Sequence, residues 1–388
     1  MKFATAVALA PILAACATAF LLTGCSTPPA TAPVAPRPVY YPSAPAVARY
    51  QYLTSFSSDK DLRDKAGKTG GFAAFIGAQE DLGVTEIIKP YGIALHDSAL
   101  YICDTIAFAI DIVDLKSGAI RRFQPKGDGR LGKPINIAVD ADGTRYVADT
   151  SWGMVLIYGA DDSYLGAIGT KGVTKPTDVA VHGDRLYIAD LLESCVKVLD
   201  RKSHKELFRI PREGDGPESK LFSPANIAVG DEGKVYVSDI GGFAVKVFDP
   251  EGRFLMRVGE LGTQIGGMVR PKGIAVDRAG RFYVVDAATE VVQVFDPEGK
   301  LLLFFGEPAG SEVGLVLPAK VMVDYDHVSL FSKYAAPDFD IEYLVFVTNQ
   351  YGPRKVSVYG FGSRRGQSAN TDGGRAVPQA AQPAGPAK

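Results

Sequence analysis

Five aspartates recur at one position of a repeated pattern, and a carboxylate is a group that can serve as a general acid or base. Each comes three residues after a tyrosine, at the end of a short apolar run. The pairs are Tyr101 and Asp104, Tyr146 and Asp149, Tyr187 and Asp190, Tyr236 and Asp239, and Tyr283 and Asp286. An aspartate that follows a strand can instead accept hydrogen bonds from backbone N–H groups of the next turn. Because all five share one position in the repeat, we interpret them as turn caps and not as catalytic groups.

A proline opens every copy of the repeat and is followed by a short apolar run, as in Ile227-Ala228-Val229. A turn, the tyrosine-containing strand, a third strand such as 245–248 and a fourth such as 254–259 complete the unit. The alternating third strands indicate half-buried antiparallel sheet. Four strands in 42–48 residues, with no room for a helix, is the period of a β-propeller blade. The opening prolines are Pro90, Pro134, Pro176, Pro224, Pro271 and Pro318.

The pattern Pro-x-x-(Ile/Val)-Ala-Val, Tyr-x-x-Asp and Val-x-Val-Phe-Asp-Pro-Glu-Gly resembles the NHL repeat, over residues 85–361. The sixth copy departs from it, because Asn349 replaces the aspartate and extra residues, including 332–340, separate its first two strands. The resemblance implies an all-β fold, a six-bladed β-propeller of four-stranded antiparallel blades. We expect the propeller to occupy residues 49–362.

The sixth copy also lacks a fourth strand, since its ordered pattern stops after residues 356–359. Residues 50–56 form a lone strand pattern well before the first copy. The simplest solution is that this N-terminal strand completes the last blade, which closes the ring and removes an exposed sheet edge.

Strand polarity places the segment entering each first strand and the loop leaving each second strand on the same face of the ring. Loop tips on this face are unusually apolar, and aromatic or methionine side chains anchor protein interfaces. The alternative is that these side chains fold inward between blades. The candidate residues for a partner-binding face are Phe108, Trp152, Met154, Leu191, Leu192 and Phe243.

The same face offers an alternative reading as a metal site. Asn136, Asp178 and Asn226 occupy equivalent positions in three successive copies and would point toward one axis. Propellers of the lactonase type hold Ca²⁺ at the corresponding place with carboxylate and amide oxygens, and oxygen ligands suit that ion. The set holds one carboxylate, and Lys320 on the same ring opposes a cation.

Other chemistries find little support. The 42 basic and 44 acidic residues give a net charge of −2, which argues against nonspecific nucleic-acid binding. The four histidines show no zinc spacing, and no Cys-x-x-Cys-His, P-loop or nucleophile elbow occurs. We expect Cys103 and Cys195 to be buried thiols and not a disulfide. No resident cofactor is predicted, Ca²⁺ being the alternative.

The first 24 residues predict export. Lys2 is the only charge before Cys25, and the apolar stretch ends in Leu22-Thr23-Gly24-Cys25, which resembles a bacterial lipobox. The resemblance implies cleavage before Cys25 and its lipidation, so that acyl chains hold the protein on a membrane. Residues 13–16 also fit the pattern, but an abrupt polar stop follows Cys25 and not Cys16. Residues 25–48 then predict a Pro/Ala-rich tether, and residues 363–388 a disordered tail.

Taken together, these features predict a lipid-anchored protein of the cell envelope, with Ser26 favouring the outer membrane. We expect a scaffold that binds another envelope protein or complex through a propeller face. The resemblance to NHL-repeat lipoproteins suggests a respiratory or electron-transfer complex. The alternative function is a Ca²⁺-dependent hydrolase of lactones or small esters, with Asn136, Asp178 and Asn226 as ligands.

Overall fold

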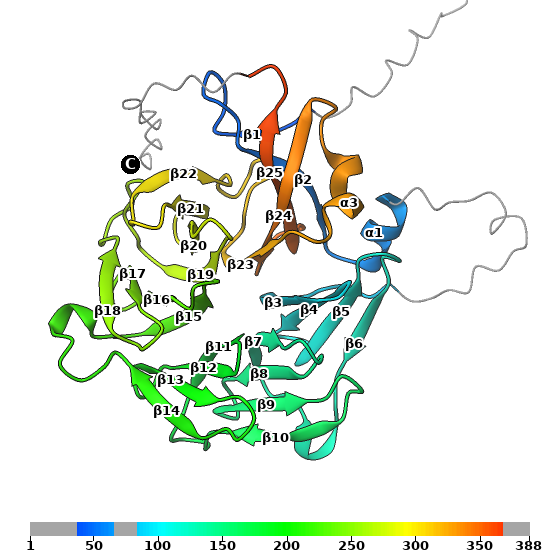
Figure 1. The fold of residues 1–388 in the computed structure, drawn as a ribbon. Coiled ribbons are helices and arrows are strands. Elements are labelled where there is room, and N and C mark those ends of the chain that lie inside the picture. The colour runs from blue at the N-terminus through cyan, green and yellow to red at the C-terminus, as the bar shows by residue number, and fades with distance from the viewer. Residues whose placement is uncertain (1–36, 66–83, 368–388) are drawn as a thin grey trace, which may run out of the picture. The chain divides into compact units, whose positions relative to one another are not determined.

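The computed structural model describes residues 37–65 and 84–367. Five four-stranded antiparallel sheets and one five-stranded sheet lie around a common axis, as Figure 1 shows. This confirms the predicted all-β, six-bladed propeller. Blade 1 is built from β3 (Pro90–His96), β4 (Ala99–Asp104), β5 (Ala109–Asp114) and β6 (Ile120–Phe123).

Blades 2 to 5 repeat this up-and-down order. Blade 2 contains β7 (Pro134–Val139), β8 (Arg145–Asp149), β9 (Met154–Tyr158) and β10 (Tyr164–Ile168). Blade 3 contains β11 (Pro176–His182), β12 (Arg185–Asp190), β13 (Cys195–Asp200) and β14 (Glu206–Ile210). Blade 4 contains β15 (Pro224–Val229), β16 (Val235–Asp239), β17 (Ala244–Phe248) and β18 (Phe254–Val258). Blade 5 contains β19 (Pro271–Val276), β20 (Phe282–Asp286), β21 (Val291–Phe295) and β22 (Leu301–Phe305).

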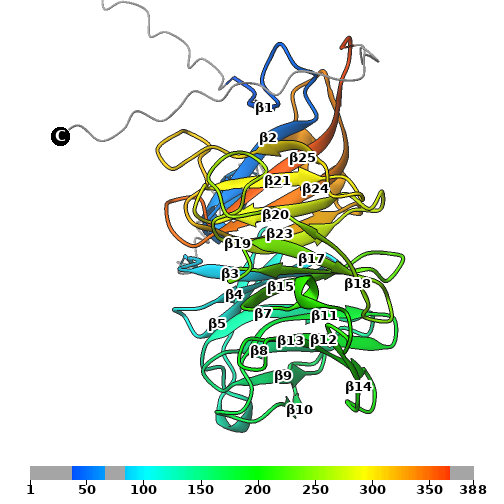
Figure 2. The same ribbon diagram turned by 90° about the vertical axis from the view of Figure 1, so that its left-hand side faces the viewer.

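Blade 6 joins the two ends of the described chain. The N-terminal strand β2 pairs antiparallel with the C-terminal strand β25, with Tyr50 opposite Phe361 and Phe56 opposite Val356. The predicted closure by residues 50–56 is therefore confirmed, and Figure 2 shows β2 and β25 lying together. The strand order is β1 (Tyr40–Tyr41), β2 (Tyr50–Phe56), β25 (Val356–Arg364), β24 (Phe339–Asn349) and β23 (Pro318–Asp324).

The folded body extends beyond the predicted limits of 49 and 362. β1 adds a fifth strand outside β2, and the Gln367 side chain accepts a hydrogen bond from the Ala48 backbone. The short helices are η1 (Gly127–Gly129), η2 (Pro217–Ser219), α1 (Asp59–Lys65), and the pair α3 (Val328–Phe331) and η3 (Ser332–Tyr334) inserted between β23 and β24. Among the described residues, no helix has the length and apolar character needed to cross a bilayer.

The first strands of the blades lie innermost and approach one another closely (Figure 1). A Cβ added at Gly92 would stand 2.4 Å from the Cα of Asn136, and one at Gly273 would stand 2.5 Å from the Cα of Lys320. Only glycine permits such an approach of two backbones. The inner strands surround a cavity of about 1010 Å³, whose walls are the apolar runs of all six first strands.

A buried polar cluster fastens the closing strand to blade 5. The hydroxyls of Tyr50 and Tyr283 lie 2.9 Å apart, and those of Tyr283 and Tyr343 lie 2.6 Å apart. Asp277 accepts hydrogen bonds from Tyr283 and Tyr343 and is ion-paired with Arg281 at 2.6 Å. Burial raises the pKa of all three tyrosines, so they stay neutral. The ring is thus sealed by side chains as well as by the β2–β25 ladder.

Candidate binding face and channel mouth

Two kinds of loop form one face of the propeller. The first kind enters each first strand, and the second leaves each second strand; together we call them the apolar face. The entering loops are 84–89, 124–133, 169–175, 211–223, 259–270 and 306–317. The leaving loops are 105–108, 150–153, 191–194, 240–243, 287–290 and 350–355. The loops at the other ends of the strands form the polar face.

The recurring aspartates position both kinds of loop. In blade 2, one carboxylate oxygen of Asp149 accepts N–H bonds from Gly132 (2.7 Å) and Lys133 (2.8 Å). The other accepts from Ser151 (3.0 Å) and Trp152 (3.1 Å). One buried carboxylate therefore ties an entering loop to a leaving loop. Asp104 and Asp286 repeat the arrangement with four donors each, which supports the interpretation of these residues as caps.

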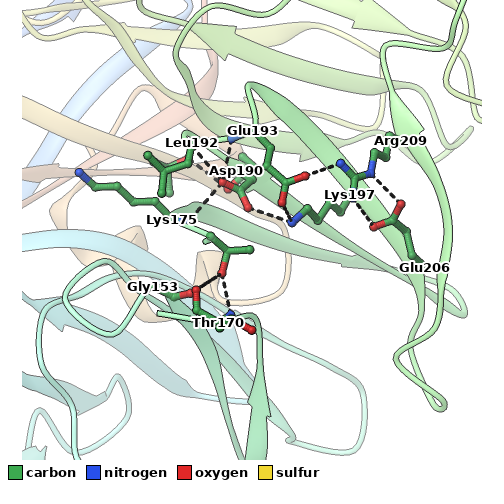
Figure 3. A network of polar contacts seen from close by, with 12 residues as sticks. Gly153, Thr170, Lys175, Asp190, Leu192, Glu193, Lys197, Glu206 and Arg209 are labelled. Carbon is green, nitrogen blue, oxygen red and sulfur yellow. Dashed lines mark hydrogen bonds and ion pairs between the residues drawn. The ribbon is translucent and has the colours of Figure 1, made fainter. Parts of the chain in front are cut away.

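Asp190 adds charged partners to the same arrangement (Figure 3). It accepts backbone N–H bonds from Lys175, Leu192 and Glu193, and its second oxygen lies 3.1 Å from the Lys197 ammonium. Lys197 also pairs with Glu193, which pairs in turn with Arg209. In blade 6 the amide of Asn349 replaces the carboxylate and accepts one backbone N–H, from Val316.

Large apolar side chains concentrate on the apolar face. Nine of them are at least 43% exposed there, in entering or leaving loops of every blade except blade 2. In the described part of the chain the loops of the polar face expose none, and the remaining exposed side chains of this kind lie on outer strands. The nine are Val84, Ile88, Ile106, Phe108, Val173, Leu192, Phe222, Leu261 and Tyr351.

The six residues predicted for partner binding divide into two groups. Phe108 and Leu192 project into solvent, at 50% and 56% exposure. Leu191 and Phe243 are half-buried. Trp152 and Met154 are also half-buried and pack against the core between blades 1 and 2. These two side chains therefore turn partly inward between blades, which was the alternative to their lying on a binding face.

Sequence reasoning did not find Val173, Phe222 and Leu261. All three lie in entering loops, which vary in length and fall outside the repeated motif. The sequence signal that could have indicated them is an apolar residue within a Gly-rich or polar stretch that precedes an opening proline.

An ion pair spans the channel mouth on the apolar face. Asp178 of β11 and Lys320 of β23 come from opposite blades, and the Lys320 ammonium lies 2.5 Å from one Asp178 oxygen. That oxygen also accepts the Ile227 N–H, and the other accepts the Val179 N–H. Burial raises the pKa of Asp178, while Lys320 opposes the shift.

Asn136 and Asn226 flank this pair, so the structure brings the three candidate metal ligands to one ring. Asn136 donates from Nδ2 to the carbonyl of Thr177, and its Oδ1 has no partner among the described residues. Both polar atoms of Asn226 are buried without a described partner. The one carboxylate of the set is already neutralised by a lysine, and the described residues hold no cluster of three or more acidic, histidine or cysteine ligands. This donor set does not fit Ca²⁺.

Lys272 lies on the same rim and is 3% exposed. Its ammonium stands 4.8 Å from the centre of the Tyr91 ring, two blades away. Burial, with Arg270 and Lys89 nearby, lowers the pKa of Lys272 to about 7. Cys103 and Cys195, as expected, are free buried thiols, whereas Cys25 lies outside the described residues.

No family model matches the chain, and the search of curated proteins finds no match. Solved structures do match. A Bacteroides thetaiotaomicron protein of unknown function has a TM-score of 0.55 at 16% identity, over 80% of this chain and 75% of that one. The Xanthomonas campestris protein XC5397, described as a gluconolactonase, has a TM-score of 0.51 at 16% identity, over 84% and 95%. Virginiamycin B lyase from Staphylococcus aureus has a TM-score of 0.49 at 12% identity, over 71% and 96%. At such identities the likeness shows the propeller fold alone.

Proposed function

We propose that this protein is a binding scaffold that engages another protein through its apolar face. The observation that carries the proposal is the one-sided distribution of exposed apolar side chains. Burying one such side chain in an interface contributes roughly 1.5–3 kcal/mol, and exposed apolar patches mark interaction sites. The aspartate caps accept hydrogen bonds from the backbone N–H groups of four of these residues, so their loops lose little entropy when a partner binds. The four are Ile88, Ile106, Leu192 and Phe222.

The charges on the apolar face favour a protein partner over a membrane or a nucleic acid. The loops that precede blades 1 to 3 carry an excess of cations over Glu86 and Asp128: Lys89, Lys126, Arg130, Lys133, Lys171 and Lys175. The loops that precede blades 5 and 6, with loop 287–290, carry Glu260, Glu290, Glu307 and Glu312 against one exposed cation, Arg270. The acidic loops around blades 5 and 6 would repel a uniformly anionic surface such as a membrane or a nucleic acid. A protein partner can present acidic groups to the basic loops and basic groups to the acidic loops.

The proposal includes the envelope setting. The lipobox-like segment around Cys25 supports a lipid-anchored protein, of the outer membrane where such a membrane exists. The NHL-like repeat supports a partner that belongs to an envelope protein complex, an electron-transfer complex being the first candidate. The hydrolase alternative gains no support from the channel mouth, because its donor set does not suit the metal that the reaction needs.

Site-specific photocrosslinking in the living host tests the proposal. A crosslinking amino acid at Leu192 or Phe222 on the apolar face should trap one defined partner. The same amino acid at Lys202 or Glu232, both exposed on the polar face, is the matched control and should trap none. Equal crosslinking from the two faces, or from the polar face alone, would contradict the proposal.

A further inference from the structure

A cleft of about 600 Å³ opens on the apolar face between blades 1 and 2. Phe108 and Trp152 contribute aromatic surface to it, while Lys126 and Arg130 contribute positive charge. Phe108 stands at a loop tip with a φ of 52°, a left-handed conformation that bulky residues rarely adopt. Gln124 holds this loop by donating to the carbonyl of Ala107.

Trp152 is fixed in place at the wall of the cleft. Its indole N–H donates to the carbonyl of Arg130 at 2.9 Å, and its backbone N–H donates to Asp149. The Arg130 guanidinium and the Lys171 ammonium lie 4.8 and 5.0 Å from its ring. A Cβ at Gly132 would come within 2.8 Å of the indole nitrogen, so this glycine is what lets the ring approach. A rigid aromatic side chain of this kind loses little entropy on binding.

The cations around the cleft have no anionic partner on the described protein. Lys126, Arg130 and Lys171 form no ion pair there, and neither does Lys133 beside them, although cations elsewhere, such as Arg122 and Arg201, do. Asp128 is the one acidic residue in loop 124–133. The cleft therefore combines an apolar floor with unpaired positive charge, which complements an apolar side chain flanked by carboxylates.

We propose that this cleft binds an acidic segment of the partner protein. An aromatic or aliphatic side chain of the segment lies against Phe108 and Trp152, and its carboxylates pair with Lys126, Arg130 and Lys171. The inference rests on the proposed function, because it names the chemistry of the partner at one site of the apolar face.

Tryptophan fluorescence gives a direct test, since Trp152 is the only tryptophan of the chain. The probe is a short synthetic peptide of glutamates and aspartates around a central Phe-Leu pair, with no tryptophan. The control peptide has every acid replaced by its amide. We expect the acidic peptide to shift the Trp152 emission to shorter wavelength and to bind about tenfold or more tightly than the control, with an affinity that falls as salt is added.

Charge reversal supplies the matched variants. Lys126→Glu with Arg130→Glu should weaken binding of the acidic peptide about tenfold or more. Lys202→Glu with Lys205→Glu, the same charge change on exposed residues of the polar face, should leave binding unchanged. Circular dichroism and the melting temperature check that all variants fold.

Three results would overturn the inference. The amide peptide could bind as well as the acidic one, the polar-face variant could lose as much affinity as the cleft variant, or phosphatidylglycerol vesicles could shift the Trp152 emission when the peptide does not. The crosslinking experiment keeps the two proposals apart. If the Lys126→Glu, Arg130→Glu variant still traps the same partner from Leu192 or Phe222 with undiminished yield, the scaffold stands and the acidic-segment inference falls.

Discussion

Replacing Asp149 tests how far the repeated carboxylates determine the shape of the apolar face. Its two oxygens accept four backbone N–H bonds, at 2.7, 2.8, 3.0 and 3.1 Å, from two different loops. Each bond to a charged acceptor contributes about 1.5–3 kcal/mol. Water can reach some of the freed donors, because Lys133 and Ser151 are exposed. We therefore expect Asp149→Ala to lower the free energy of unfolding by about 3–5 kcal/mol, and not by the full sum.

Urea unfolding followed by the emission of Trp152 measures this effect, because the indole lies in one of the two tethered loops. Asp149→Asn keeps the shape of the side chain but turns an NH₂ group toward N–H donors, so we expect a loss of about 2–4 kcal/mol. Asp142→Ala, at an exposed aspartate of the same blade, is the control and should change stability by no more than about 0.5 kcal/mol. If Asp149→Ala stayed within about 1 kcal/mol of the unaltered protein with native Trp152 emission, the aspartates would not be holding the loops.

Four further predictions follow from the structure. Lys272→Met should stabilise the protein by on the order of 4 kcal/mol at pH 6 and by much less at pH 10. The folded-state pKa of Lys272, about 7, lies below that of the unfolded lysine, so between the two values the folded state binds fewer protons and the stability of the unaltered protein rises with pH. Equal shifts of the melting temperature at both pH values would contradict this. Tyr283→Phe should cost about 1–3 kcal/mol in urea unfolding because it removes the centre of the blade 5–blade 6 cluster, whereas the same change at exposed Tyr351 should cost no more than about 0.5 kcal/mol. Calcium should leave the melting temperature unchanged, since Lys320 neutralises Asp178; a clear rise with Ca²⁺ would revive the hydrolase reading. Radiolabelled palmitate should enter the natural chain and not a Cys25→Ala variant, and labelling of both would place the anchor elsewhere.

The fold could be predicted from the sequence because each blade repeats the same physical solution. The opening proline recurs in six copies, and the alanine at the centre of the first strand and the terminal aspartate recur in register in five. A pattern that is weak in one copy is therefore strong over the whole repeat. Closure of the ring could also be predicted. The strand pattern at 50–56 lacks a partner and the last copy lacks a fourth strand, and both facts are explained if residues 50–56 complete the last blade. The short strand β1 escaped prediction since two residues show no periodicity.

The candidate site could be predicted only in part, because its geometry depends on contacts across the ring. The positions of Asn136, Asp178 and Asn226 on one rim follow from the repeat. That Lys320 reaches across to Asp178 depends on side-chain length and on which blades face each other. Likewise the projection of Phe222 depends on the irregular loop 211–223, for which the repeat offers no template.

The β2–β25 ladder has a consequence for the order in which the protein is made. Strand β2 pairs with β25, Val356–Arg364, the last strand of the propeller. The edge of β2 that faces β25 therefore stays unpaired until the ribosome has added residue 356 and the residues after it. During that interval the edge of Tyr50–Phe56 is open to wrong partners. A chain truncated before residue 356 would keep five intact blades and yet have no means of joining its ends.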